Sequence, residues 1–259
     1  MLKIRVIPIL TFNGFGLVKT KIFSNPRMVG NPLQAARVYN SRDVDELVFL
    51  DIRASEQNRK INFDLVKEIV RECMMPLAIG GGIADLNDIE KLLKAGADKV
   101  VIKTKALLDP GFIKQTAAYF GRQCITVSAD AKITENGYVI YNKNMLPVSL
   151  EDFLKQSEDN GAGEFIVTSV DNDGMMTGFD IPLINIASGI VSVPVVACGG
   201  GGNLTHYKKL FEETKIEAVA SASIFHFTQY TPNDIKRTLL EIGLPVRENI
   251  QAGFTYPKC

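Results

Sequence analysis

Eight short runs of mainly apolar residues recur along the chain, and longer, mostly amphipathic stretches separate them. Such alternation predicts strands that each lead into a helix and therefore run parallel in one sheet. The predicted strands are IRVIPIL, ELVFLDI, PLAIGG, KVVIKT, CITVSAD, EFIVTSV, PVVACGG and EAVASAS. Eight such units predict an α/β fold, a (β/α)8 TIM barrel, over residues 1–248, with a C-terminal tail at 249–259. A doubly wound open sheet is the alternative.

An internal repeat favours the closed barrel over the open sheet. The glycines 80–82 recur 119 positions later as glycines 199–201. Thr104 recurs at the same spacing as Ser223. Self-similarity at a fixed period indicates a duplicated structural unit. We therefore expect two half-barrel repeats that close into one barrel.

Charge and cysteine usage argue against several classes of protein. Lys plus Arg and Asp plus Glu number 29 each, so no overall basic field favours nucleic acid. No apolar run reaches the roughly 18 residues of a membrane-spanning helix, and the N-terminus lacks a signal-peptide pattern. The four cysteines lack metal-ligand spacing and there are only two histidines. We expect a cytoplasmic protein with no metal, no cofactor, and no nucleic-acid or membrane partner.

Glycine-rich segments after two predicted strands indicate phosphate-binding loops. Gly81 and Gly82 follow the third strand, and residues 200–201 follow the seventh. Such loops expose backbone N–H groups, and the next helix adds its N-terminal dipole. Thr104 and Ser223, at the ends of the next strands, supply hydroxyls that suit phosphate oxygens. Two loops on opposite sides of the mouth predict a substrate with two anionic ends; the alternative is that the glycines, which include Gly200 and Gly201, only make tight turns.

Asp130, at the end of the fifth predicted strand, is the candidate general acid or base. Alternation along the strands points Asp130 and its repeat counterpart, Thr11, inward on opposite sides of the mouth. Asp130 is the only carboxylate of that pair, and its alternative role is to cap the following turn. The same alternation brings Lys103 to the mouth, and we expect Lys19 to join it from the loop after the first strand.

The sixth predicted strand and the polar loop after it supply further candidates for substrate binding, which are Thr168, Asp173 and Gly174. Asp171 and Asp173 could each act in catalysis. Both could instead form side-chain turns before Gly174, as aspartates in loops often do.

Four charged residues at strand starts point into the barrel by the same alternation, and they are Arg5, Glu46, Lys99 and Glu164. Lone charges are costly in an interior, so we expect a ring of two cations and two carboxylates. A stabilising plug is one interpretation of this ring. The inward residues above it are small or apolar, so the column could be packed solid or could pass a small neutral molecule.

Several segments resemble the cyclase subunit of imidazole glycerol phosphate synthase, namely ELVFLDI, GGGI.D, GADKVVIKT, GAGEFIVTS.D.DG and IFHF. The resemblance extends to about residue 248. It implies a class I glutaminase docked on the N-terminal face, ammonia that passes a charged gate and crosses the barrel, and a bisphosphate substrate at the top. It also implies that the four inward charges form this gate and that Asp98 lies at the glutaminase contact.

The mouth departs from the pattern of that family. The family has two facing aspartates there; Asp130 matches one, but Thr11 replaces the other. Lys103 replaces an asparagine, Arg53 a small polar residue and Met175 a hydroxyl residue. The segment ITENGYVIYNKNMLPVS lacks the family's Asn-Thr-Gly stretch. Loss of one positioned acid or base typically lowers a rate by about 10²–10⁴-fold.

These departures lead to the hypothesis of a specialised paralogue, similar to those found with surface-polysaccharide genes. It would receive ammonia from the glutaminase and pass it towards an ATP-dependent amidotransferase that makes acetamidino groups on a sugar. Lys19, Arg53 and Lys103 would make the mouth more positive, which favours a phosphorylated substrate or an acidic partner. The alternatives are a genuine histidine-biosynthesis cyclase that tolerates Thr11 and a non-catalytic ammonia conduit that activates the glutaminase. An isomerase of the same half-barrel family is a further alternative, although it also needs two facing carboxylates.

Overall fold

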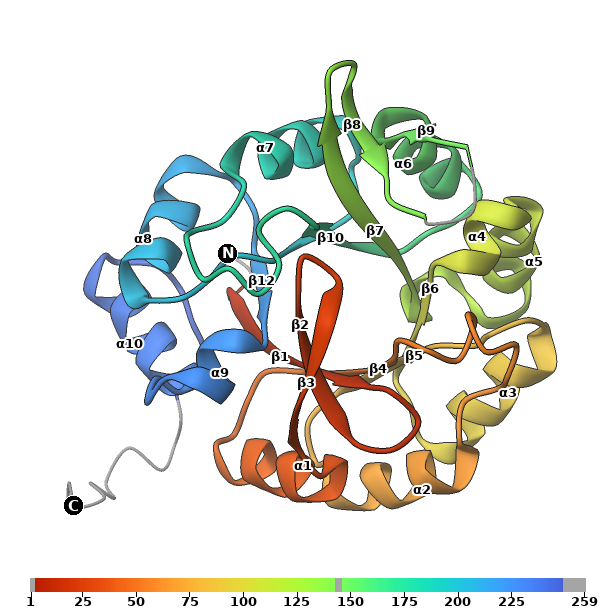
Figure 1. Ribbon diagram of the computed structural model, residues 1–259, viewed down its shortest axis with the longest axis horizontal. Helices are drawn as coiled ribbons and strands as arrows, with labels where there is room; N and C mark the ends of the chain where they lie inside the picture. Colours follow the sequence, from red (N-terminus) through yellow and green to blue (C-terminus); the bar gives the residue numbers. More distant parts are fainter. Residues whose placement is uncertain (1–2, 143–145, 249–259) are drawn as a thin grey trace.

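Eight parallel strands form a closed barrel in the computed structural model, which describes residues 3–142 and 146–248 (Figure 1). The strands are β1 (Arg5–Phe12), β4 (Leu47–Asp51), β5 (Leu77–Gly80), β6 (Lys99–Ile102), β7 (Ile125–Thr134), β10 (Glu164–Ser169), β11 (Val195–Cys198) and β12 (Ala218–Ser221). Each pairs with the next in this order, and β12 pairs with β1 to close the ring. The predicted (β/α)8 barrel is confirmed, and the predicted tail at 249–259 lies outside the described residues.

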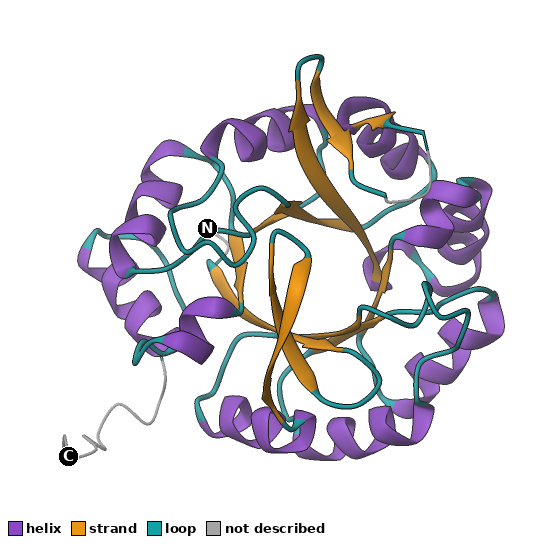
Figure 2. Cartoon of the chain, viewed as in Figure 1, coloured by secondary structure: helices purple, strands orange, loops and turns teal. Residues whose placement is uncertain are grey.

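Helices surround the barrel on its outside (Figure 2). The longer ones are α1 (Pro32–Ser41), α2 (Phe63–Glu72), α3 (Leu86–Ala95), α5 (Gly111–Phe120), α6 (Leu150–Asp159), α7 (Ile181–Ile190), α8 (Leu204–Glu213) and α10 (Pro232–Glu241), and η1 (Arg122–Cys124) is a 3₁₀ turn. Side chains of Asn, Asp, Ser or Thr cap the N-termini of all the longer helices except α5. Such caps satisfy free N–H groups and fix where each helix begins. No helix within the described ranges is long and apolar enough to cross a membrane.

Two short helices repeat each other and confirm the half-barrel relation. Helix α4 (Thr104–Leu108) follows β6, and α9 (Ser223–Phe227) follows β12. Their bounds differ by 119 positions, which is the spacing of the glycine repeat. In the barrel order β1 lies opposite β7, and β6 lies opposite β12. The duplicated units therefore place matching residues on opposite sides of the mouth.

Two hairpins extend the barrel beyond the predicted units. Strands β2 (Leu17–Lys21) and β3 (Ser24–Gly30) form the first, and the end of β7 with β8 (Gly137–Ile140) forms the second, to which β9 (Val148–Ser149) adds. Figure 1 shows the first in front of the barrel and the second projecting outward. Lys19 lies on β2, so the expectation that it sits in a loop is wrong.

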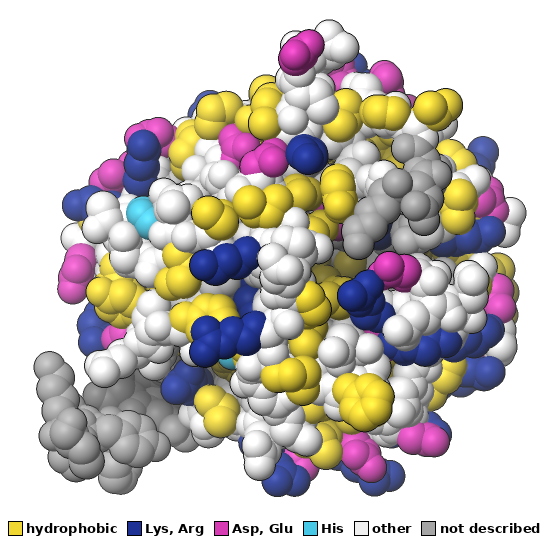
Figure 3. Space-filling view, viewed as in Figure 1, with side chains coloured by type: hydrophobic (Ala, Val, Ile, Leu, Met, Phe, Trp, Pro, Cys, Tyr) yellow, Lys and Arg dark blue, Asp and Glu magenta, His cyan; other side chains and the backbone are white. Residues whose placement is uncertain are grey.

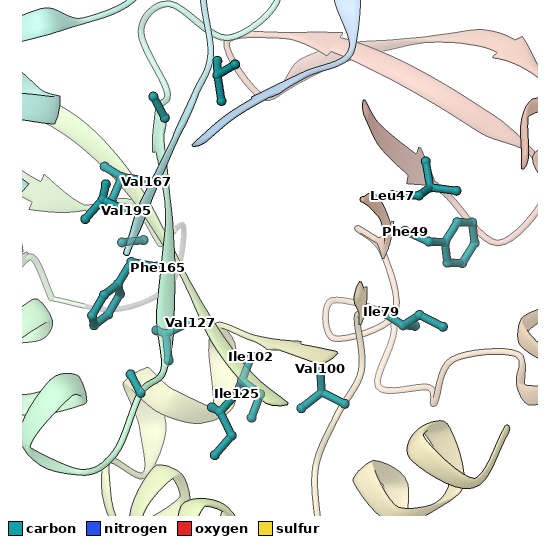
Figure 4. Packing of buried hydrophobic residues seen from close by; sticks show 14 of the residues in the cluster. Leu47, Phe49, Ile79, Val100, Ile102, Ile125, Val127, Phe165, Val167 and Val195 are labelled. Atoms are coloured by element: carbon teal, nitrogen blue, oxygen red, sulfur yellow. The ribbon is translucent and has the colours of Figure 1, made fainter. Parts of the chain in front are cut away.

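Alternating side chains divide the core into two parts. One cluster fills the barrel interior and consists of Ile7, Ile9, Val48, Ala78, Val101, Ile166, Val196, Ala218 and Ala220. The larger cluster packs between strands and helices, and Figure 4 shows part of it, with Leu47, Phe49 and Phe165 among the labelled residues. On β4, Val48 faces inward while its neighbours face the helices. The predicted inward alternation is confirmed, and it positions the mouth residues.

Candidate active site

A cavity of about 830 Å³ opens where the barrel strands end. This volume lies within the range of small-molecule sites. The mouth residues predicted from the sequence all line it, namely Thr11, Lys19, Gly81, Gly82, Lys103, Thr104, Asp130, Thr168, Asp173, Gly174, Gly200, Gly201 and Ser223. Figure 3 shows this face, where basic and hydrophobic side chains gather around the centre. The structure thus brings residues from both half-barrels into one cavity.

The two glycine loops require backbone conformations that favour glycine. Gly81 has a φ of 114° and Gly200 a φ of 104°, in the left-handed region. Beside the second loop, the hydroxyl oxygen of Ser223 is buried and has no hydrogen-bond partner among the described residues. A buried polar group without a partner is uncommon in native proteins. An anion held by the Gly200 loop and the start of α9 would supply an acceptor for this hydroxyl.

Substitution of Gly200 by alanine is expected to distort this loop, because a Cβ there would lie 1.9 Å from the carbonyl oxygen of Gly178. We expect Gly200→Ala to lower the free energy of unfolding by about 1–3 kcal/mol and to weaken binding of inorganic pyrophosphate. Thermal unfolding and calorimetric titration measure the two effects. Gly189→Ala on α7 is the control, since nothing lies within 4 Å of its added Cβ. Equal stability and pyrophosphate affinity in the two variants would contradict the assignment.

Lys19 and Asp173 form a buried ion pair at the mouth, with Nζ to carboxylate distances of 2.7 and 2.9 Å. The Thr20 hydroxyl also donates to Asp173, at 3.2 Å. Asp171 instead accepts a hydrogen bond of 3.0 Å from the backbone N–H of Ile133. The structure therefore separates the two aspartates that the sequence left equivalent: Asp173 lines the cavity, while Asp171 supports the β7–β8 hairpin.

Thr11 and Asp130 lie on opposite strands of the barrel and both line the cavity. The Thr11 hydroxyl donates a hydrogen bond to the backbone carbonyl of Val18, so its proton is engaged within the β2–β3 hairpin. Asp130 accepts hydrogen bonds from Lys103 at 2.5 Å and from Ser128 at 3.2 Å. Of the two facing residues only Asp130 carries a charge, and Lys103 pairs with it.

The three cations expected to make the mouth positive each have a carboxylate partner. Lys19 pairs with Asp173, Lys103 pairs with Asp130, and Arg53 pairs with Glu56. Each pair is formally neutral. The prediction that these three residues make the mouth more positive is therefore wrong, because a carboxylate neutralises each of them.

Two features of the mouth were missed by sequence reasoning. Phe23 and Tyr141 stack edge to face with ring centroids 5.7 Å apart, and they join the β2–β3 hairpin to the segment after β8. The ammonium group of Lys103 lies 5.7 Å from the Phe23 ring. Cys198, at the end of β11, also lines the cavity, and burial raises the pKa of its thiol to about 12. The aromatic contact carried no sequence signal because neither hairpin was predicted.

The four inward charges at the opposite end form the predicted ring. Arg5 contacts Glu46 at 2.5 Å and also contacts Glu164. Lys99 contacts the same two carboxylates at 3.1 and 2.8 Å. Burial opposes ionisation of Glu164, but the two cations outweigh this effect and hold the pKa of Glu164 below its ordinary value. Each cation thus bridges both carboxylates, and the ring is closed.

Asp98 lies at the same end of the barrel as the ring, directly before Lys99. Asp98 is exposed, and one of its carboxylate oxygens accepts a 2.8 Å hydrogen bond from the backbone N–H of Leu77. A small depression of about 230 Å³ lies beside it, with Met74, Met75 and Pro76 among its lining residues. Asp98 is therefore separate from the mouth cavity and available at the N-terminal face.

Fold and cavity define the class as a half-barrel-repeat (β/α)8 protein with a ligand cavity at its mouth. The chain matches the family described as "Histidine biosynthesis protein" over residues 5–231. It is 38% identical over 251 residues to imidazole glycerol phosphate synthase subunit HisF of Streptococcus mutans serotype c, which covers 95% of this chain and 100% of the relative. It therefore belongs to the HisF-type family of histidine biosynthesis proteins.

Two further relatives bear the same name. The subunit of Staphylococcus saprophyticus is 40% identical over 252 residues, covering 95% of this chain and 100% of the relative. That of Lactococcus lactis subsp. cremoris is 38% identical over 252 residues, covering 95% and 97%. The predicted family resemblance is confirmed, whereas these names give no support to the specialised polysaccharide branch.

Proposed function

We propose that this chain is the ammonia-accepting subunit of a glutamine amidotransferase complex and that its mouth binds a phosphorylated small molecule. The observation that carries the proposal is the arrangement along the barrel axis. A closed ring of four charges lies at one end, a largely apolar interior follows, and the cavity with its two glycine loops lies at the other. A class I glutaminase docked over the ring, with Asp98 at the contact, would supply the ammonia.

Each part of this axis has a distinct role in the proposal. The ring keeps water and ions out of the interior until the docked glutaminase opens it. The two glycine loops, with Thr104 and Ser223, hold the anionic ends of the substrate. Asp130 and Lys103 move protons at the reacting atoms, because they are the charged pair that faces Thr11 across the mouth.

The names of the relatives favour cyclisation in histidine biosynthesis as the reaction at the mouth. In this candidate the substrate is the bisphosphate of that pathway, whose two anionic ends suit the two loops. Asp130 supplies the acid or base, and cyclisation proceeds without a carboxylate at position 11. The comparisons support this candidate better than sugar amidation.

The geometry around Thr11 favours a second candidate, in which ammonia serves an ATP-dependent amidation of a sugar for surface polysaccharide. The Thr11 hydroxyl is engaged by a backbone carbonyl, and Lys103 neutralises the facing Asp130. Cyclisation with proton transfer on both sides of the forming ring needs two positioned acid or base groups. The mouth offers one carboxylate in this facing pair, which suits delivery of ammonia better than two-sided proton transfer.

An assay of cyclisation with free ammonium and the histidine-pathway bisphosphate separates the two candidates. If the sugar candidate holds, the native chain should be slow and Thr11→Asp should gain about 10²–10⁴-fold, because the variant restores a second acid or base. Thr205→Asp, at an exposed position on α8, is the control for added charge. Native turnover within the ordinary enzymatic range of about 1–10³ s⁻¹ would establish the cyclase and exclude the sugar candidate.

A further inference from the structure

Between the ring and the mouth, the described part of the barrel interior is polar along a single strand, β7. Among the described residues, the interior cluster takes apolar side chains from the seven other strands. On β7 the inward positions at this level are Thr126 and Ser128, whose side chains are buried. Two hydroxyls therefore form a stripe, called here the β7 hydroxyl stripe, in an otherwise apolar tube.

Hydrogen bonds join this stripe to the charged groups at both ends. The Thr126 hydroxyl donates to the Glu164 carboxylate of the ring, at 3.4 Å. The Ser128 hydroxyl donates to the carboxylate of Asp130 at the mouth, at 3.2 Å. The parallel pairing of β7 with β10 sets this order, because Thr126 lies beside Glu164 in the sheet. The stripe therefore runs from the ring to the candidate acid without leaving one strand.

Ammonia has three N–H donors and one lone pair, and an apolar interior satisfies none of them. A hydroxyl can donate one hydrogen bond and still accept others through its lone pairs. The stripe hydroxyls donate to carboxylates, so their oxygens can accept from ammonia. Residues two apart on a strand lie about 6.6 Å from each other, so ammonia can pass from one hydroxyl to the next in one short step. The tube therefore offers ammonia a more favourable route along β7 than along the other strands.

We propose that Thr126 and Ser128 are positioning residues that guide ammonia along β7 and release it beside Asp130 and not beside Thr11. This inference rests on the ammonia transfer proposed above. It also locates the ammonia acceptor: its electrophilic carbon lies on the β7 side of the cavity, near the Lys103–Asp130 pair. No residue of the stripe bonds covalently to ammonia in this proposal.

The functional test compares glutamine-dependent with ammonium-dependent product formation in the complex with the glutaminase. Thr126→Val and Ser128→Ala remove the hydroxyls at nearly constant volume. We expect each to lower the ratio of the two activities by about fivefold, the effect of one lost hydrogen bond, and the double variant to lower it further. Ammonium from bulk solution reaches the mouth directly, so the ammonium-dependent kcat of Thr126→Val should not change. Ser128 also donates to Asp130, so Ser128→Ala is compared only through the ratio of the two activities. An unchanged ratio would overturn the proposal.

Two control variants separate the hydroxyl from general packing effects. Thr126→Ser keeps the hydroxyl and should keep the ratio. Val196→Thr places a hydroxyl on β11 and should not rescue the Thr126→Val/Ser128→Ala variant. Rescue by Val196→Thr would show that any interior hydroxyl suffices and would overturn the assignment to β7.

A second measurement depends on neither the glutaminase nor the substrate. High-resolution crystal structures of the native chain and of Thr126→Val/Ser128→Ala, both grown with ammonium chloride, report solvent inside the barrel. We expect ordered solvent within hydrogen-bond distance of the stripe hydroxyls in the native chain and none in the variant. A dry native interior would overturn the stripe even if ammonia transfer were established. If transfer failed while the ordered solvent was present, the proposed function would fail and the polar route would stand.

Discussion

Replacement of Asp130 by asparagine is expected to lower ammonium-dependent product formation by about 10²–10⁴-fold, the usual effect of losing one positioned acid or base. The side chain keeps its size but can no longer take up a proton as a carboxylate. Lys103 loses the partner that holds it at 2.5 Å. Steady-state kinetics with ammonium in place of glutamine measures the effect, which should fall mainly on kcat.

Glutamine hydrolysis measured in the same samples distinguishes chemistry at the mouth from a conduit. If the barrel only activates the glutaminase, Asp130→Asn keeps both hydrolysis and overall activity, and the role assigned to Asp130 is wrong. Asp64→Asn is the matched control, because its carboxylate is exposed on α2 and does not line the mouth cavity. It should leave both activities unchanged.

Replacement of Glu164 by glutamine is expected to lower the free energy of unfolding by about 3 kcal/mol near neutral pH, since breaking a buried ion pair leaves charge uncompensated. Arg5 and Lys99 would then share Glu46 alone inside the barrel. For a chain of this size such a loss lowers Tm by roughly 6–12 °C. Urea unfolding and calorimetry give the two quantities.

The pH dependence of this effect has a defined direction. The pKa of Glu164 lies below its ordinary value of 4.5, so its ionised form stabilises the fold above that value. The contribution is lost as the pH falls through the lowered pKa. The stability difference between the native chain and Glu164→Gln should therefore be constant from about pH 6 upward and shrink in strong acid. A difference that grows in acid, or a variant as stable as Glu72→Gln at an exposed pair, would contradict the ring's role.

The barrel was predictable because its signal is local and periodic. Each of the eight predicted strands is an apolar run that a helix follows. The repeat at 119 positions indicates two equal halves, which favours a closed barrel over an open sheet. The β2–β3 hairpin was not predictable in this way. Strand β3 is mostly exposed and contains Pro26, and the hairpin is fixed by distant contacts such as the one between Ile22 N–H and the Asp173 carbonyl.

In the candidate site, too, the features that depend on strand alternation were predictable and those that depend on the β2–β3 hairpin were not. Strand alternation sufficed to predict the ring and the placement of Lys103 with Asp130, because these residues lie on the strands or directly beside their ends, where the alternation still holds. The partner of Lys19 was not predictable, since Asp173 lies 154 positions away and is reached through the unpredicted hairpin. The hydrogen bond that engages Thr11 depends on Val18 of that same hairpin.

The charge ring places a limit on how symmetric the two half-barrels can be. The repeat counterparts of Arg5 and Lys99, 119 positions later, are Cys124 and Ala218, whereas Glu46 matches Glu164 at a spacing of 118. An exact tandem copy of the first half would enclose four cations against two carboxylates in one low-dielectric tube, and the excess charge would have no partner. Electroneutrality at the barrel floor therefore requires that the second half lack both cations. A single half joined to a second copy of itself could close the sheet but could not close this gate.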